Sequence, residues 1–220
     1  MVTHGAPRHD EGVIKFTADH VATGIPLPVP PDVLGPLTGW RTILWDLGLI
    51  GQAPARYGGA GFGNVSARVS AGAAAFWVTG TQTGGRRVLG DTDVALVEKH
   101  DVRRNRVASR GPVPPSSESM THGAIYEHGR HVRWVFHVHS PVLWKAAARL
   151  ELPRTPVDAP YGTPEMAAEV DRLFRDGPLR RLRVLSMDGH EDGIVSFGTT
   201  AEEAGTALLA QLARALSTGN

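Results

Sequence analysis

The stretch Val132-Arg133-Trp134-Val135-Phe136-His137-Val138-His139-Ser140-Pro141 decides how the chain is organised. Its first half is rich in β-branched and aromatic residues, which favours a β-strand. Because side chains alternate between the two faces of a strand, His137 and His139 are predicted to point in the same direction. Ser140-Pro141 ends the strand and can open a helix, since proline suits the first helical turn.

Two imidazoles side by side on a rigid strand form half of a metal site. Zinc or a similar divalent ion binds neutral imidazole nitrogen readily. The alternative is a pair of surface histidines on a half-exposed strand. The rest of the chain decides between these two interpretations.

The composition is that of an ordinary globular protein. The chain has 220 residues, 41% of them hydrophobic and 20% charged, which is enough for one substantial domain. The 23 basic and 22 acidic residues give no broad basic surface, so composition speaks against nucleic acid as a partner. There is no cysteine, which excludes disulfides, zinc–thiolate sites and cysteine nucleophiles. A metal would therefore need His, Asp or Glu ligands.

No targeting or membrane signal stands out. No apolar run approaches the length of a membrane span, and the N-terminus lacks the basic-then-apolar pattern of a signal peptide. We therefore expect a cytoplasmic protein that does not bind a membrane.

The chain divides into an N-terminal arm, residues 1–35, and a domain, residues 36–220. The arm carries Gly, Pro and His with little periodicity, and the proline-rich stretch 25–31 is typical of polyproline II structure. We expect it to be flexible or to dock on a neighbour. The domain should begin with an amphipathic helix over 36–49.

The remaining elements alternate between hairpins and amphipathic helices, which predicts a single α/β domain with helices covering a central sheet. Ser117, Thr163 and Thr200 are expected to cap three of the helices. Strands are expected at 65–69, 75–79, 96–100, 106–109, 132–136, 182–187 and 194–197, and helices at 118–127, 142–150, from 164 onward and from 201 onward.

Two glycine-rich loops could bind an anion. The stretch 57–68 has four glycines in seven residues, and Thr79-Gly80-Thr81-Gln82-Thr83-Gly84-Gly85 combines glycines with hydroxyls. Such loops can present N–H groups and hydroxyls to phosphate or polyol oxygens. Neither is a nucleotide-binding Walker loop, and a tight structural turn is the alternative for the first. Ser116-Ser117, at a predicted helix N-terminus, is a third candidate anion site.

His190 lies in a glycine-flanked turn between two predicted strands, where its side chain can be aimed into a cleft. It could join His137 and His139 as a third ligand. Three histidines with an open position are typical of a catalytic zinc site. Glu118 could merely complement a helix dipole, but beside a metal it becomes a candidate acid/base residue.

These motifs together resemble the class II aldolase/adducin family, which includes fuculose- and rhamnulose-phosphate-type aldolases and ribulose-phosphate 4-epimerase. The resemblance spans roughly residues 37 to 216, and the 19-residue interval from Glu118 to His137 (137 − 118) fits the family. Five motifs occur in the family's order: Gly63-Asn64-Val65-Ser66-Ala67-Arg68, the Thr-Gly loop, Ser116-Ser117-Glu118, His137-Val138-His139, and His190 with Gly193.

The resemblance implies a three-layer α/β/α fold with a largely antiparallel central sheet, and a homotetramer with active sites between subunits. It implies a divalent metal, usually Zn²⁺, with Mn²⁺ or Co²⁺ as alternatives, and Glu118 as the acid/base residue. Tyr161 resembles the catalytic tyrosine that a neighbouring subunit donates in the fuculose-type aldolases. The implied metal ligands are His137, His139 and His190, and the implied substrate-phosphate ligands are Asn64, Thr83, Gly84, Ser116 and Ser117.

Three departures from the family pattern concern the site. Thr79-Gly80 competes with Thr83-Gly84 for the phosphate, because the loop is longer than a simple Thr-Gly. The segment after Tyr161 is shortened. The turn reads His190-Glu191-Asp192-Gly193 where the family has His-Gly, so Glu191 or Asp192 could reach the metal or the substrate.

The implied activity is that of a metal-dependent aldehyde-lyase. It would cleave a small hydroxy-ketone, which we expect to be phosphorylated, by retro-aldol chemistry through a metal-stabilised enediolate. A sugar-phosphate 4-epimerase or a dehydratase could use the same site. The alternative from another class is a non-catalytic adducin-like association module, although all three histidines and Glu118 are present here.

Overall fold

The strand that carries the histidine pair, β8 (Trp134–His139), lies inside a nine-stranded sheet in the computed structural model, which describes residues 11–217. The other strands of this sheet are β1 (Thr17–Ala22), β4 (Asn64–Arg68), β5 (Phe76–Thr79), β6 (Val94–Asp101), β7 (Arg106–Gly111), β9 (Arg154–Thr155), β10 (Val184–Met187) and β11 (Gly193–Gly198). Their order is β1-β7-β6-β5-β4-β8-β11-β10-β9. Only the outer pairs β1/β7 and β9/β10 are parallel, so the largely antiparallel sheet is confirmed.

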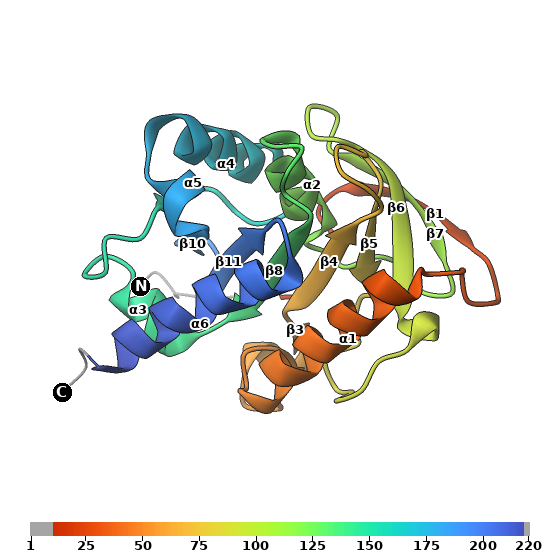
Figure 1. Cartoon of the computed structure of the whole chain (residues 1–220), viewed down its shortest axis with the longest axis horizontal. Helices are drawn as coiled ribbons and strands as arrows, with labels where there is room; N and C mark the ends of the chain where they lie inside the picture. The colour runs from red at the N-terminus through yellow and green to blue at the C-terminus, as the bar shows by residue number, and fades with distance from the viewer. Residues whose placement is uncertain (1–10, 218–220) are drawn as a thin grey trace, which may run out of the picture.

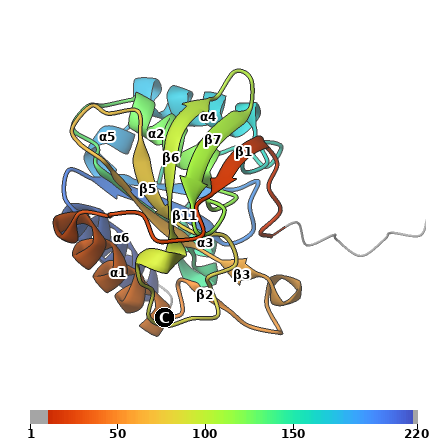
Figure 2. The same cartoon turned by 90° about the vertical axis from the view of Figure 1, so that its right-hand side faces the viewer.

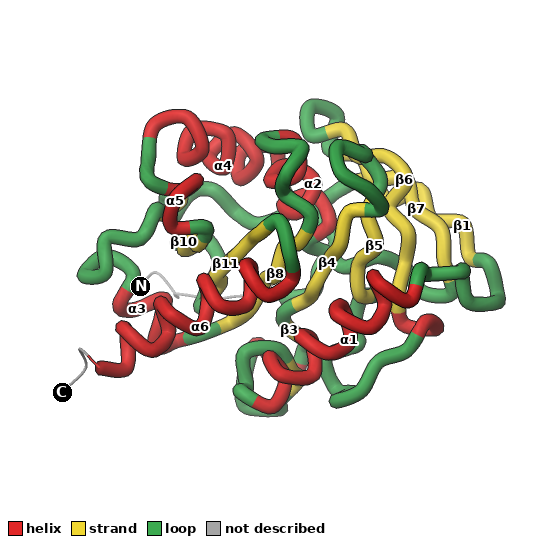
Figure 3. The backbone as a smooth tube through the Cα atoms, viewed as in Figure 1, coloured by secondary structure: helices red, strands yellow, loops and turns green. Residues whose placement is uncertain are grey.

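Helices cover both faces of the sheet, which confirms the three-layer α/β/α architecture (Figures 1 and 2). One layer consists of α1 (Pro31–Asp46), α3 (Pro141–Ala146) and α6 (Ala201–Ser217), and the other of α2 (Ser119–Glu127), α4 (Pro164–Asp176) and α5 (Leu179–Leu182). Figure 3 shows long loops at the ends of the strands, and these contain the short pair β2 (Gly51–Gln52) and β3 (Gly61–Phe62) and the 3-10 turns η1 (Tyr57–Gly59) and η2 (Asp91–Asp93). Among residues 11–217, no helix has the length and apolarity needed to cross a membrane.

Successive side chains of β8 point to opposite faces of the sheet, and each face has its own hydrophobic core. Phe136 and Val138 pack in the core beneath α1, α3 and α6, whereas Val135 packs in the core beneath α2, α4 and α5. His137 and His139 therefore lie on the α2 and α4 face, as their spacing predicts. The antiparallel neighbours β4 and β11 hold β8 from both sides, which fixes the direction of both imidazoles.

The N-terminal region differs from the expected arm. Residues 17–22 form β1, which pairs in parallel with β7, and Phe16, Leu27 and Val29 are buried. The edge of β7 offers backbone N–H and C=O groups, and β1 satisfies them. The first helix begins at Pro31 rather than Pro36, with proline in its first turn. Residues 1–10 of the expected arm lie outside the described part of the chain.

Two further expectations about secondary structure were wrong. Ser117 is not the cap of α2, because the helix begins at Ser119 with Glu118 in the N-cap position. The strand expected from residue 182 begins at Val184, because the preceding residues form α5, which Arg183 ends in a left-handed conformation (φ 57°). The side chain of His100 is 5% exposed, and its ring packs against Phe76.

Candidate metal centre and substrate pocket

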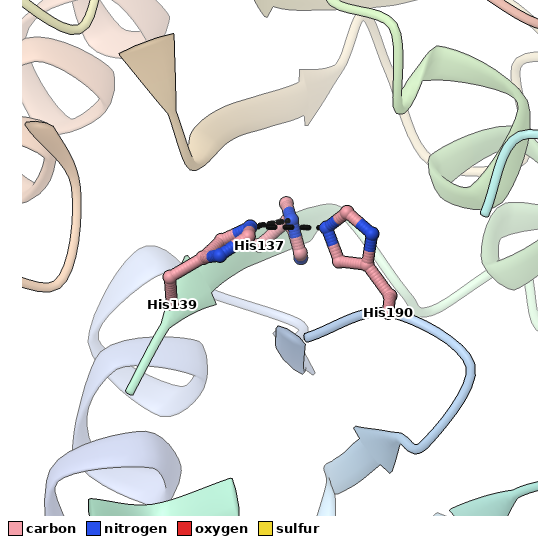
Figure 4. Close-up of side chains that lie close together, drawn as sticks. All are labelled: His137, His139 and His190. Atoms are coloured by element: carbon pink, nitrogen blue, oxygen red, sulfur yellow. Dashed lines mark hydrogen bonds between the residues drawn. The ribbon is translucent and has the colours of Figure 1, made fainter. Parts of the chain in front are cut away.

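Three imidazoles from two parts of the chain converge on one point. Figure 4 shows His137 and His139 on β8 facing His190, which comes from the turn before β11. The Nε2 atom of His139 lies 3.2 Å from that of His137 and 3.0 Å from that of His190. Zinc–nitrogen bonds of about 2.0–2.1 Å in tetrahedral geometry place ligand nitrogens about 3.3 Å apart. The spacing of the three nitrogens therefore fits a single divalent ion.

The position of His190 depends on the glycine that follows its turn. Gly193 pairs with His139 at the start of β11, so the turn folds back directly onto the histidine strand. A Cβ atom on Gly193 would lie 2.5 Å from Cδ2 of His190. A side chain there would push the imidazole away, and this explains a glycine three residues after the histidine.

All three histidines are held in the neutral form. Burial lowers the pKa of His137 to about 4 and the pKa of His139 and His190 well below the usual value, with the neighbouring histidines adding to the effect at the last two. Neutral imidazole is the form that binds a metal. The three side chains are therefore ready to act as ligands at neutral pH.

Two buried carboxyl groups flank the histidines. An oxygen of Glu118 lies 3.7 Å from Nε2 of His190, and burial raises the pKa of this side chain, which is 2% exposed, to about 7. Within residues 11–217, neither of its oxygens accepts a hydrogen bond of normal geometry. Oε2 of Glu11 lies 3.3 Å from Nε2 of His190 and 3.5 Å from Nε2 of His139. Burial, and then the charge of Glu118, raises the pKa of Glu11 to about 8.

This charge pattern supports the metal assignment. Ionising two carboxyl groups in this desolvated site beside three neutral imidazoles is costly, and this cost is why the pKa of each group is raised. A divalent cation on the three Nε2 atoms would offset both negative charges. The residues present therefore fit the metal that the sequence implies.

The five residues expected to bind phosphate line one pocket next to this centre. Glu11 belongs both to the histidine cluster and to the pocket wall, so the two are contiguous. Thr79 does not line the pocket, since its Oγ1 accepts a hydrogen bond from the backbone N–H of Val65 in the adjacent strand. Gly80 does line it. The pocket brings together Asn64, Thr83, Gly84, Ser116 and Ser117.

The chain was compared with models of known protein families and with known proteins. Residues 54–216 match the family model described as the class II aldolase and adducin N-terminal domain. The chain belongs to this family. No curated protein matches the chain in a sequence search.

Solved structures of other class II aldolase folds superpose on this chain at low sequence identity. L-Fuculose-1-phosphate aldolase from Thermus thermophilus aligns with a TM-score of 0.56 at 20% identity, covering 86% of this chain and 97% of that one. Another L-fuculose 1-phosphate aldolase gives 0.61 at 17% identity, covering 86% and 85%. A sugar-phosphate aldolase from Thermotoga maritima gives 0.56 at 17% identity, covering 83% and 94%. At these identities the likeness concerns the fold.

In this class II aldolase/adducin family member, Asp192 in the turn after His190 holds a tyrosine. The hydroxyl of Tyr57 donates to Oδ2 of Asp192 at 2.6 Å, and the ring edge of Tyr57 packs on His139 with centroids 4.6 Å apart. Asp192 therefore fixes Tyr57 against the imidazole. The role of Tyr57 could not be foreseen, because the two partners lie 135 residues apart in sequence.

Tyr161 lies in the site of its own chain. Its ring stands edge-on to His190, with centroids 4.4 Å apart. Its hydroxyl accepts a hydrogen bond from the backbone N–H of Val13 and donates to the backbone oxygen of Val13, both at 3.1 Å. The amino group of Lys15 lies 4.0 Å from the centre of the ring. The expected proton donor is thus within the site, with its hydroxyl bound to the N-terminal segment.

A buried arginine shapes the second glycine loop of the pocket. The guanidinium of Arg41, on α1, donates to the backbone oxygens of Thr83 and Arg87, both at 2.9 Å, and also to that of Arg86. Burial lowers the pKa of Arg41 to about 10, so it stays charged at neutral pH. Loop residue Gly84 packs so closely on Gly51 that a Cβ atom there would overlap its backbone oxygen. The glycine loop therefore has a structural role as well as a place in the pocket wall.

Replacing Arg41 by methionine is expected to lower the free energy of unfolding by about 3 kcal/mol, because the loop carbonyls lose several charge-assisted hydrogen bonds. Urea unfolding measures this change. Arg87→Met is the control, since the Arg87 side chain pairs with Asp46 at the surface, where 52% and 44% of the two side chains are exposed. Its effect on stability is expected to be much smaller, because solvent screens an exposed ion pair. Equal losses in the two variants would contradict this role of Arg41.

Proposed function

We propose that the protein is a metal-dependent aldehyde-lyase that cleaves a small phosphorylated hydroxy-ketone by retro-aldol chemistry. The observation that carries the proposal is the buried carboxyl of Glu118, with its pKa raised to about 7, beside three neutral imidazoles at metal-binding distances. A perturbed acid in a pocket next to a metal centre is typical of proton-transfer chemistry. The enzymes of known fold described above, which are sugar-phosphate aldolases, agree with this substrate class.

His137, His139 and His190 would hold the divalent metal, with zinc as the first choice and manganese or cobalt as alternatives. When bound, such an ion acts as a Lewis acid that stabilises negative charge developing on a substrate oxygen. The histidines are preorganised for this ion, because the sheet and the Gly193 turn fix all three rings.

In the cleavage direction, Glu118 would give a proton to the substrate carbon that is released when the C–C bond breaks, and in the reverse direction it would take that proton back. A carboxyl group with a pKa of about 7 is present in both protonation states at neutral pH, so it can serve as base and as acid. Its carboxyl oxygen lies 3.7 Å from Nε2 of His190, and this closeness to the proposed metal ligands supports the role. Tyr161, at the edge of the same imidazole, would exchange the proton of the leaving aldehyde oxygen.

The polar pocket would bind the phosphate and orient the substrate. Hydroxyl groups of Thr83, Ser116 and Ser117, the amide of Asn64 and the backbone at Gly84 line it. Hydroxyls and backbone N–H groups are suitable donors for phosphate oxygens. We further propose, from the family resemblance, a cytoplasmic homotetramer with active sites between subunits.

Metal content and product analysis test this proposal together. We expect about one metal per chain in untagged protein, its loss in His137→Ala, and two carbonyl fragments when a panel of ketose 1-phosphates is incubated with the metal-loaded protein. Mass spectrometry separates these fragments from a single epimer or from loss of water, which would indicate an epimerase or a dehydratase. No metal and no turnover, even after Zn²⁺ or Mn²⁺ is added, would favour an adducin-like association module.

A further inference from the structure

Residues 11–15, which we call the strap, lie across the candidate active site. Glu11 contacts the Nε2 atoms of His139 and His190 through one carboxylate oxygen. Two residues later, the backbone of Val13 forms two hydrogen bonds with the hydroxyl of Tyr161. Lys15 then packs over the face of the same tyrosine ring. The strap is thus bound both to the metal ligands and to the expected proton donor.

The strap also fills the pocket proposed for phosphate. Glu11 and Gly12 form part of its wall, and Gly12 lies so close to Gln82 that a Cβ atom on the glycine would overlap the side-chain amide. The free volume of the pocket is about 20 Å³, which is room for about one water molecule. Among the described residues that line the pocket, only Glu11 is acidic or basic, and its ionised form is negative. A phosphate therefore meets a steric barrier while the strap is in place, and an electrostatic barrier whenever Glu11 is ionised, as it would be on a bound metal.

The Glu11 carboxylate is placed as a ligand rather than as a surface acid. Only 9% of its side chain is exposed. Its oxygen lies 3.3 Å and 3.5 Å from two of the three ligand nitrogens, close to the separation of about 3.3 Å between neighbouring ligand atoms around a tetrahedral zinc. Carboxylate oxygen is a normal zinc ligand.

We propose that Glu11 is a fourth, displaceable ligand of the metal, and that substrate binds by moving the strap away. This inference rests on the proposed metal site. Displacement would vacate a coordination position for the substrate, remove the negative charge from the phosphate pocket and release the hydroxyl of Tyr161 from Val13. All three effects would come from the movement of the strap alone. In the free enzyme, the strap would therefore keep the site closed.

Two binding measurements on Glu11→Gln test the inference without relying on turnover. Competition with a chromophoric chelator should show that the variant binds Co²⁺ about 10- to 100-fold more weakly than the wild type, because a charged ligand is lost. Calorimetry with the zinc-loaded proteins should show inorganic phosphate binding at least tenfold more tightly to the variant. Glu202→Gln, which changes an exposed acid at the start of α6, is the control and should match the wild type in both.

The outcomes separate this inference from the function on which it rests. Wild-type affinity for both Co²⁺ and phosphate in Glu11→Gln would overturn the role of Glu11 and leave the metal site intact. Failure of the wild type itself to bind Co²⁺, with His137→Ala indistinguishable from it, would instead overturn the metal site. Glu11→Ala provides a second variant, because an amide oxygen can still coordinate weakly whereas a methyl group cannot.

Discussion

Replacing Glu118 by glutamine is expected to lower kcat about 10³-fold while the metal stays bound. Glutamine keeps the shape of the side chain but cannot take up and return a proton, and a positioned acid/base group contributes roughly 10²- to 10⁴-fold. The three histidines are untouched, so elemental analysis should still find the metal of the wild type. The metal-free variant should be at least as stable as the metal-free wild type, because a buried carboxyl that is costly to ionise is exchanged for a neutral group of the same shape.

The matched control for this experiment is Glu127→Gln. Glu127 ends the helix that begins after Glu118, but 53% of its side chain is exposed and it pairs with His100 away from the metal centre. This variant should retain the turnover and the melting temperature of the wild type. A kcat of Glu118→Gln within tenfold of the wild type would remove Glu118 from the mechanism.

The parts of the site that could be predicted from sequence are those fixed by local geometry. The alternation of β8 places His137 and His139 on one face whatever the rest of the fold does. A glycine-flanked turn between two strands delivers His190 to the end of the same sheet, because β11 pairs directly with β8. The order of the motifs along the chain resembles that of one family. The model of this family matches most of the chain.

The parts that sequence could not supply depend on contacts between distant residues with no periodic signal. β1 joins the sheet by pairing with β7, about 90 residues later, and an irregular stretch rich in Gly and Pro gives no sign of it. Glu11 reaches the histidines only because β1 anchors the chain just beyond it. In the sequence, Arg41 resembles a solvated residue on an amphipathic helix. Its hydrogen bonds go to backbone oxygens, which every residue has, so the sequence does not indicate them.

The start of α2 could not be predicted correctly from the types of residue alone. Ser117 has the residue type of a helix cap, but it lines the pocket and does not occupy the N-cap position. Ser116 accepts a hydrogen bond from the backbone N–H of Glu118, and the helix starts one residue later than propensity suggests. The delay leaves Glu118 at the N-cap position, buried beside the three histidines, so a residue type that is not among the preferred caps occupies this position.

Removal of the metal is expected to lower the melting temperature by about 8 to 16 °C. An ion present at about 1,000 times its dissociation constant stabilises the folded state by about 4 kcal/mol. For a chain of this size, each kcal/mol corresponds to about 2–4 °C. The structural reason is that the carboxyl groups of Glu11 and Glu118 lie beside the three neutral imidazoles, where a bound cation would attract both of them. Differential scanning calorimetry before and after chelation, and again after zinc is restored, measures the shift.

The shift should vanish in His139→Ala and persist in His128→Ala. His139 is the central ligand, with its Nε2 atom within 3.2 Å of both other ligand nitrogens, so its loss leaves two histidines and a gap between them. His128 is stacked on Phe174 at the far end of α2 and pairs with Asp171, so its replacement changes the stability of the protein without touching the metal centre. Because each variant is compared with its own metal-free form, a cavity left by the missing imidazole cancels out. An unchanged zinc-dependent shift in His139→Ala would mean that the ion binds elsewhere, and the assignment of the three histidines would then be wrong.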